Sequence, residues 1–505
     1  MECRQKALAE ILDFYFKSKT GLIAINEERK TEFNFLKPLQ SAAIKKSLTS
    51  DCMIILPTGY GKSLIFELLP RICCSKVLIV TPLNAIIQEQ VQRLGPNAMK
   101  IDGKILNSLS RKDYTEESTQ NFLRGNVRYV FSHPENVVNK HVCEVFKGGA
   151  WNAVSHVIID EAHCVVQWGQ DFRPDFQQLS KLRSIFPTAY FVTMTATATV
   201  HMQKEIAKIL CMKKFNTVST NVDRENVKII IRKRLPSTGG RNTPEDAFDE
   251  VMGPIIDKLY QDVDSYPRTI VYTKLKWCGY GYSLAKRKAL ELNTHHLIQR
   301  VSQFHASCTE KSKVEVTKDM STEEGKIKLL FATEAYGMGA DPPDVHQVIH
   351  IGPPSSLETY LQEVGRAGRD GQGCTAILFF NMNDIGTPHV KNEVKSFCLL
   401  DSCRRKFISE HFGYTFNKLS QMHACCDICE KSCPCDNCFA EEVNKCEIVS
   451  PPANRISKKQ KLNELSRILL AFFEDEINNM TYHIQKLLQA CQSRRQIKLH
   501  HLQTS

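Results

Sequence analysis

The sequence contains no apolar run that approaches the roughly 18 residues needed to span a bilayer. Its N-terminus, MECRQKALAEILDFYFKSK, carries charges where the apolar core of a secretory signal would lie. We therefore expect no membrane association, and we predict an amphipathic helical segment over residues 1–30. Without a secretory signal, the twenty cysteines are expected to be reduced thiols in the cytosol or nucleus.

Tryptophan is also scarce, with three in 505 residues. One of them, Trp168, lies in the stretch DEAHCVVQWGQDFRP (160–174), among two glutamines, a glycine and an aspartate that are poor neighbours for a core residue. This leaves two hypotheses, a binding residue or a side chain that packs between domains. The net charge of 66 − 55 = +11 is compatible with an anionic partner but does not identify one.

Short runs rich in valine and isoleucine alternate with helical patterns along most of the chain. This alternation is typical of doubly wound parallel sheets, which carry functional loops at the strand ends. The runs form two series, DCMIILP, KVLIVTP, VRYVFSHP, SHVIIDEAH and AYFVTMTATAT, then VKIIIRKR, RTIVYTK, KIKLLFATEAYG, DVHQVIHIGPP and TAILFFN. We predict two α/β domains, at 31–222 and 223–390, followed by a small helical Cys-rich region at 391–440 and a basic helical tail at 441–505.

The stretch LPTGYGKS follows a predicted strand and opens a helical pattern, as a phosphate-binding loop does. Leu56 departs from the strict motif, but the following residues keep its chemistry. Glycines let backbone N–H groups surround phosphates, the lysine can reach the β- and γ-phosphates, and the serine can reach Mg²⁺. The candidate nucleotide-binding residues are Pro57, Thr58, Gly59, Tyr60, Gly61, Lys62 and Ser63.

Asp160 and Glu161 end the predicted strand VSHVIID. A carboxylate at this point can bind Mg²⁺ through water, and its neighbour can orient an attacking water. Together with the phosphate loop, the pair predicts hydrolysis of ATP rather than nucleotide storage.

The chain resembles RecQ-type DNA helicases of superfamily 2 over roughly residues 30–430. The matching segments are LKPLQ, LPTGYGKS, VTPLNAIIQEQ, DEAHCVVQWGQDFRPDF, TATA, FATEAYGMGADPPDVHQVIH and LETYLQEVGRAGRDG. The resemblance implies two tandem RecA-like domains, a zinc-binding region and a nuclear ATP-dependent 3′-to-5′ DNA helicase of DNA repair or recombination. The expected partner is single-stranded and forked duplex DNA, and the resemblance identifies no particular protein partner. A full winged-helix domain, which separates strands in longer relatives, is not expected after Cys438.

The resemblance also assigns roles to individual residues. Gln40 would contact the adenine edge, with Lys37 where the family usually has arginine. In QEVGRAGR, Arg366 and Arg369 would reach the γ-phosphate, with Arg369 as the finger that neutralises transition-state charge and Gln362 as a nucleotide sensor.

In this family the loop that follows the DEAH box contacts single-stranded DNA. Trp168, Phe172 and Arg173 would offer stacking faces and a cation to a strand. Because the loop is joined to Asp160 and Glu161, contact with a strand could move the hydrolytic carboxylates.

Nine of the cysteines fall within residues 398–446, which predicts a metal site in a reducing compartment. The family's zinc site matches three of them and leaves the fourth ligand open between a thiolate and an imidazole. The candidate ligands are Cys403, Cys426 and Cys429 with either Cys425, which we favour slightly, or His423. A rival set is Cys426, Cys429, Cys435 and Cys438.

Two other functions compete with the helicase. A DNA-binding or strand-annealing factor could use ATP only as a switch, but the complete hydrolytic set argues against it. An RNA-remodelling motor is suggested by the DEAH box and disfavoured by the RecQ-type loop that follows it. The expected cofactors are ATP, Mg²⁺ and Zn²⁺.

Overall fold

The computed structural model describes residues 36–82, 84–167, 174–235, 243–337, 342–417, 419 and 421–435. The predicted N-terminal segment at 1–30 and the predicted tail at 441–505 lie outside these residues. Among the helices that are described, none combines the length and the apolar character needed to cross a bilayer.

The first half of the chain forms a seven-stranded parallel sheet with the order β3-β4-β2-β5-β6-β1-β7. Its strands are β1 (Asp51–Ile55), β2 (Lys76–Val80), β3 (Ala98–Ile101), β4 (Tyr129–Ser132), β5 (Val154–Ile159), β6 (Tyr190–Thr195) and β7 (Phe215–Ser219). Its α-helices are α3 (Pro38–Ser47), α4 (Lys62–Ile72), α5 (Asn84–Leu94), α6 (Gly103–Arg111), α7 (Glu117–Arg124), α8 (Pro134–Val137), α9 (Lys140–Phe146), α10 (Cys164–Gln167), α11 (Leu182–Ile185) and α12 (Val200–Ile209).

Both faces of this sheet are buried under helices. Cys52 and Ile54 of β1 lie in an apolar cluster with residues of α3 and α4, whereas Met53 and Ile55 lie in a second cluster with residues of α6, α9 and α12. Because side chains alternate between two buried faces, the strand is a continuous apolar run rather than an alternating one.

The second half forms a six-stranded parallel sheet with the order β10-β11-β9-β12-β13-β8. Its strands are β8 (Val227–Lys233), β9 (Thr269–Tyr272), β10 (Val301–Phe304), β11 (Leu329–Ala332), β12 (Gln347–Ile351) and β13 (Cys374–Phe380). Its helices are α13 (Pro244–Gln261), α14 (Leu275–Glu291), α15 (Glu310–Met320), α16 (Leu357–Val364) and α17 (Met382–Ile385). The predicted fold class, two doubly wound parallel-sheet domains in series, is confirmed.

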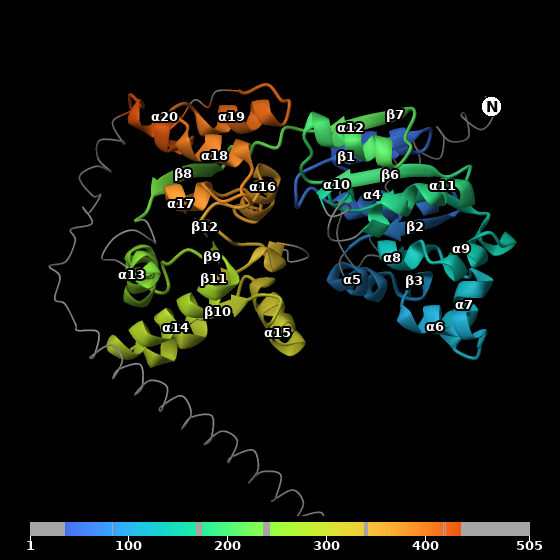
Figure 1. Cartoon of the computed structure of the whole chain (residues 1–505), viewed down its shortest axis with the longest axis horizontal. Coiled ribbons are helices and arrows are strands. Elements are labelled where there is room, and N and C mark those ends of the chain that lie inside the picture. Colours follow the sequence, from blue (N-terminus) through green and yellow to red (C-terminus); the bar gives the residue numbers. More distant parts are fainter. Residues whose placement is uncertain are drawn as a thin grey trace, which may run out of the picture. The chain divides into compact units, whose positions relative to one another are not determined.

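The Cys-rich region packs against the second sheet. Its helices are α18 (Asn392–Leu399), α19 (Arg404–His411) and α20 (Asp427–Lys431), and Figure 1 shows them together beside β8. Phe397, Ile408 and Cys426 lie in the same apolar cluster as Ile229 of β8. The backbone N–H of Ile229 also donates to the carbonyl of Cys425 at 3.3 Å. This region therefore shares its core with the second sheet.

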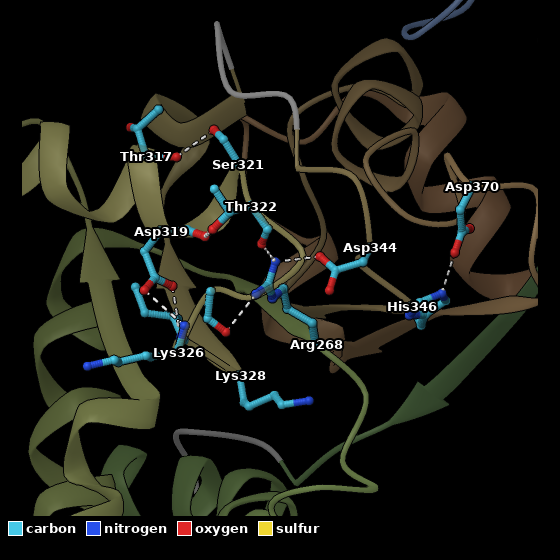
Figure 2. Close-up of polar contacts among 12 residues, drawn as sticks. Arg268, Thr317, Asp319, Ser321, Thr322, Lys326, Lys328, Asp344, His346 and Asp370 are labelled. Atoms are coloured by element: carbon cyan, nitrogen blue, oxygen red, sulfur yellow. Dashed lines mark hydrogen bonds and ion pairs between the residues drawn. The ribbon is translucent and has the colours of Figure 1, made fainter.

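Arg268 ties together the loops at the amino edge of the second sheet. Its side chain is 3% exposed and donates to the carbonyl oxygens of Thr322 (2.8 Å) and Gly325 (2.9 Å). It also pairs with Asp344, and Figure 2 shows these contacts converging on one guanidinium. These bonds fix the segments that precede β9, β11 and β12, while the carboxyl edge carries the loops described next.

Candidate nucleotide and metal sites

The phosphate loop joins β1 to α4 at the carboxyl edge of the first sheet. Gly59 (φ 76°) and Gly61 (φ 85°) adopt left-handed conformations that suit glycine. α4 begins at Lys62, and a helix N-terminus favours an anion, while the N–H of Leu64 already donates to the carbonyl of Gly61 at 3.2 Å. The ammonium of Lys62 donates to the carbonyls of Leu56 (3.0 Å) and Pro57 (3.4 Å). The loop therefore has the conformation and charge that a phosphate group needs.

Gln40 of α3 clamps this loop. Its Nε2 donates to the carbonyls of Tyr60 and Gly61, both at 3.0 Å, and its Oε1 accepts from the backbone N–H of Lys37 at 2.9 Å. The φ of +85° favours glycine at position 61, and a Cβ atom there would also displace Gln40 Nε2, which would lie 2.6 Å away. The Lys37 ammonium lies 4.8 Å from the centroid of the Tyr60 ring. The structure brings the predicted adenine-contacting residues to the loop, and their contact with adenine stays a prediction.

Asp160 and Glu161 lie directly after β5. Burial, followed by the charge of Glu161, raises the pKa of Asp160 to about 7, while Lys62 opposes the shift. A divalent cation beside Asp160 would favour its charged form, and carboxylate and hydroxyl oxygens are the donors that Mg²⁺ prefers. The two carboxylates, with Ser63 at the start of α4, therefore fit a magnesium ion.

His163 links the hydrolytic carboxylates to the second half of the chain. The Nε2 of His163 lies 3.1 Å from Gln362 Nε2, and its Nδ1 lies 3.0 Å from Thr195 Oγ1 and 3.4 Å from Glu161 Oε2. Burial lowers the pKa of His163, which favours the neutral ring. The bonds assign the tautomer: the Gln362 amide donates to Nε2, and Nδ1–H donates to Thr195, whose hydroxyl donates to the carbonyl of Thr197 at 3.1 Å.

The arginine loop, Gly365–Asp370, follows α16 and contacts the phosphate loop. The carbonyl of Gly365 accepts from Thr58 Oγ1 at 3.1 Å and from Arg369 Nε at 3.3 Å. A Cβ atom on Gly59 would lie 3.9 Å from Arg369 Cδ. The two loops, about 300 residues apart in the sequence, therefore meet at one place.

The two arginines of this loop have different surroundings. Burial, followed by the charge of Arg224, lowers the pKa of Arg369 to about 10. Arg366 is 3% exposed, and its guanidinium lies 5.8 Å from the centroid of the Tyr336 ring. The structure therefore places Arg369 beside the phosphate loop and packs Arg366 against an aromatic ring of its own domain.

Four cysteines lie close together in the Cys-rich region. The sulfur atoms of Cys403, Cys425, Cys426 and Cys429 all lie within 4.8 Å of one another, and those of Cys403 and Cys425 are 3.7 Å apart. A tetrahedral zinc with sulfur at 2.3 Å places its ligands about 3.8 Å apart. Four cysteine sulfurs are a donor set that structural zinc sites commonly use. The geometry and chemistry of these four residues fit a zinc ion.

His423, the alternative fourth ligand, lies elsewhere. Its Nδ1 is 3.7 Å from Cys433 Sγ, and it is not part of the four-sulfur group. Between the two alternatives, the structure brings Cys425 to the other three cysteines. Cys438 of the rival set lies outside the described residues.

Comparison with known proteins identifies the family. Residues 37–206 match the DEAD/DEAH box helicases, and residues 255–371 match the helicase conserved C-terminal domain. A helicase Q1 of Caenorhabditis briggsae is 30% identical over 454 residues, which cover 86% of this chain and 69% of that protein. The chain belongs to the RecQ-type ATP-dependent DNA helicase family.

Other relatives support this assignment and show how much of their length the chain matches. The ATP-dependent DNA helicase Q1 of Rattus norvegicus is 30% identical over 424 residues, or 80% of this chain. The match covers 63% of the rat protein, so this helicase-family chain spans less than two thirds of that relative's length. The Mycobacterium smegmatis helicase Lhr, solved with single-stranded DNA and AMP-PNP, has a TM-score of 0.56 at 18% identity. That match covers 79% of this chain and 51% of Lhr, and it shows a shared fold of two RecA-like domains.

The predicted DNA-contacting residues of this RecQ-type chain, Trp168, Phe172 and Arg173, lie outside the described residues. The described residues stop at Gln167, the last residue of α10, and continue from Pro174. Their roles stay predictions.

Sequence reasoning overlooked three functional candidates, His163, Thr195 and Arg224. The first two lie inside the DEAH and TATAT stretches, so the motifs themselves carried a signal for them. Arg224 stands in an unremarkable turn-like stretch, and only the folded chain reveals its contact with the arginine loop.

Proposed function

We propose that this chain is an ATP-dependent 3′-to-5′ DNA helicase or translocase, which couples ATP hydrolysis to movement along one strand and to unwinding. The contact between the two loops carries the proposal, because Thr58 of the phosphate loop donates to Gly365 of the arginine loop. A nucleotide site built from both domains opens or closes as nucleotide binds and leaves. A motor needs that coupling, whereas a nucleotide store does not.

In the proposed reaction ATP lies between the two loops. Lys62 neutralises the β- and γ-phosphates, and Glu161 accepts a proton from the water that attacks the γ-phosphorus. The bond from that phosphorus to the β–γ bridging oxygen breaks, and ADP and phosphate leave. Arg369 stabilises the charge that builds up during the transfer. Bound Mg²⁺, held by Ser63 and through water by Asp160, would supply further charge neutralisation.

The loop that carries Trp168, Phe172 and Arg173 is proposed to contact the strand. Stacking on aromatic side chains tolerates any base, because every base has a π-face. Only the short helix α10 separates this loop from the carboxylates at the end of β5. Strand contact can therefore reach Glu161 through a few residues of chain, which would account for stimulation of hydrolysis by DNA.

A cavity at the carboxyl edge of the second sheet supports a strand path over that domain. It has a volume of about 560 Å³ and is lined by Tyr272, Trp277, His350 and Glu363, among others. Ligands of open α/β sheets bind at this edge. Its wall also carries the cations Arg234 and Lys274, which suit phosphates, beside aromatic rings on which bases can stack.

Zinc is proposed to hold the Cys-rich region in place through Cys403, Cys425, Cys426 and Cys429. With four protein ligands the ion has no open position, so its contribution is structural. Strand direction, a nuclear location and a role in DNA repair or recombination are proposed from the family resemblance. The stretch RISKKQK (455–461) is a weak candidate for nuclear import.

Replacement of the phosphate-loop lysine tests the proposal. Lys62→Ala should abolish ATP hydrolysis and leave single-stranded DNA binding largely intact, because Lys62 lies at the phosphates and not on the strand path. Lys204→Ala, which removes an exposed lysine of α12, is the matched control and should retain the wild-type rate. Undiminished turnover in Lys62→Ala would contradict the motor. Hydrolysis without unwinding in the wild type would favour the strand-annealing alternative.

A further inference from the structure

The connector between the two sheets lies against the arginine loop. Residues 223–226 lead from β7 toward β8 and supply side-chain bonds to that loop. Arg224 Nη1 donates to the carbonyl of Gly365 at 3.0 Å, and its Nη2 donates to the carbonyl of Gly368. One guanidinium therefore holds both ends of the tight stretch that precedes Arg369.

Asn226 adds to this attachment. Its Nδ2 donates at 2.8 Å to the carbonyls of Gly368 and Gln372. Gly368 has φ +60°, and a Cβ atom there would lie 2.5 Å from Asn226 Nδ2. The left-handed backbone conformation therefore favours glycine, and a Cβ atom there would also displace the Asn226 amide.

The connector is itself fixed from its other side. Asp223 pairs with Arg405 of α19 at 2.8 Å, and the Arg405 side chain is fully buried. Arg405 Nη1 also donates to the carbonyl of Val227 at 2.9 Å. Because breaking a buried pair of this kind is strongly unfavourable, the connector is a firm support for the loop it holds.

The far end of the arginine loop has a separate tie. His346 Nε2 lies 2.8 Å from Asp370 Oδ2, and Figure 2 shows this pair at the start of β12. The backbone N–H of Gly368 also donates to the carbonyl of Val345 at 2.7 Å. Arg369 therefore projects from a loop held at both ends, and Arg224 provides the hold nearest the phosphate loop.

We propose that Arg224 is a positioning residue for ATP hydrolysis: it holds the carbonyls of Gly365 and Gly368 so that Arg369 faces the phosphate loop. The inference rests on the proposed function, since it concerns the rate of that reaction. The Gly365 carbonyl accepts from Arg224, Thr58 and Arg369 alike, so it is the point at which connector, phosphate loop and finger meet.

Positioning and direct phosphate contact by Arg224 make different demands on the side chain. A guanidinium can donate to two carbonyls at once, whereas a lysine ammonium is a single point of charge on a flexible stem. If Arg224 acts through the loop, Arg224→Lys should lose nearly as much activity as Arg224→Ala. If its charge acts on ATP directly, Arg224→Lys should retain most of the activity.

The test uses the full chain and steady-state ATP hydrolysis at saturating single-stranded DNA. Arg224→Ala should lower kcat by about 10- to 100-fold, the scale of a small displacement of a catalytic group, with KM for ATP changed less than about threefold. Asn226→Ala, a milder change to the same loop, should lower kcat by a smaller factor. Arg300→Ala is the matched control, because Arg300 is half-buried in the same domain and donates to the carbonyl of Lys326 at 3.2 Å. It should retain the wild-type kcat.

A double variant separates positioning from loss of folding. In an Arg369→Ala background, Arg224→Ala should change kcat by less than about twofold, because the group that it positions is absent. Equal losses in both backgrounds, or wild-type kcat in Arg224→Ala, would overturn the proposal. If the wild-type chain itself fails to hydrolyse ATP, the proposed function fails first, so the two failures are distinguishable.

Discussion

Removal of the Gln362 side chain should uncouple the two halves of the nucleotide site. Its amide donates to Nε2 of His163, which is 4% exposed and stands three residues after Asp160. A bond between neutral groups contributes about 1 kcal/mol, and a buried acceptor left without its donor costs up to about 3 kcal/mol. At about 1.4 kcal/mol per tenfold in rate, Gln362→Ala should lower kcat by about 5- to 150-fold.

The assay is ATP hydrolysis with saturating single-stranded DNA, with kcat and KM determined separately. KM should change little, because the phosphate loop and Gln40 remain. Gln203→Ala is the matched control, since Gln203 donates to the carbonyl of Ala198 at 3.1 Å within the first domain. In a His163→Ala background the effect of Gln362→Ala should largely vanish. A wild-type kcat in Gln362→Ala, or a loss equally large in both backgrounds, would refute the reasoning.

Three further predictions concern the loop, the metal and the core. Trp168→Ala should lower DNA-stimulated hydrolysis far more than basal hydrolysis, with about 1–3 kcal/mol of DNA-binding free energy lost; equal loss of both rates would make it a packing residue. Metal analysis should find one zinc per chain, which is lost in Cys425→Ser and kept in His423→Ala. Zinc kept in Cys425→Ser and lost in His423→Ala would instead make His423 the fourth ligand. Burial lowers the pKa of His156 from 6.5 to about 4. As the pH falls below 6.5, His156 becomes protonated in the unfolded chain but stays neutral in the folded chain. The free energy of unfolding should therefore fall by about 3 kcal/mol between pH 6.5 and pH 4. In denaturant unfolding the wild type should lose about 3 kcal/mol more than His156→Gln over this range, because the other titrating groups are present in both proteins.

The inner strands of both sheets could be predicted from the sequence, and of the four edge strands only β8 could. β1, β2, β5 and β9 are buried on two faces, so their runs are continuously apolar. The strands missing from the prediction are β3, β7 and β10, which all lie at sheet edges. They are four or five residues long and carry lysine, asparagine, serine or glutamine, which weakens the apolar signal.

The candidate site divides in the same way. The phosphate loop and the two carboxylates are local motifs, because each needs only one strand end and a few neighbouring residues. Other contacts of the site join segments that are distant in the sequence, so no local sequence pattern predicts them. These are the contact of Thr58 with Gly365 and that of Arg224 with the arginine loop. The choice between Cys425 and His423 depended on the turn before α20, which the spacing of cysteines leaves open.

Unwinding tests the central claim most directly. The purified chain should be given forked DNA and, in a parallel reaction, an RNA duplex of the same sequence, each with ATP and Mg²⁺. A DNA motor separates the forked DNA with a 3′ single-stranded arm, leaves the RNA duplex intact, and loses this activity in Lys62→Ala. Separation of the RNA duplex at an equal or greater rate, or separation of DNA by Lys62→Ala, would contradict the account.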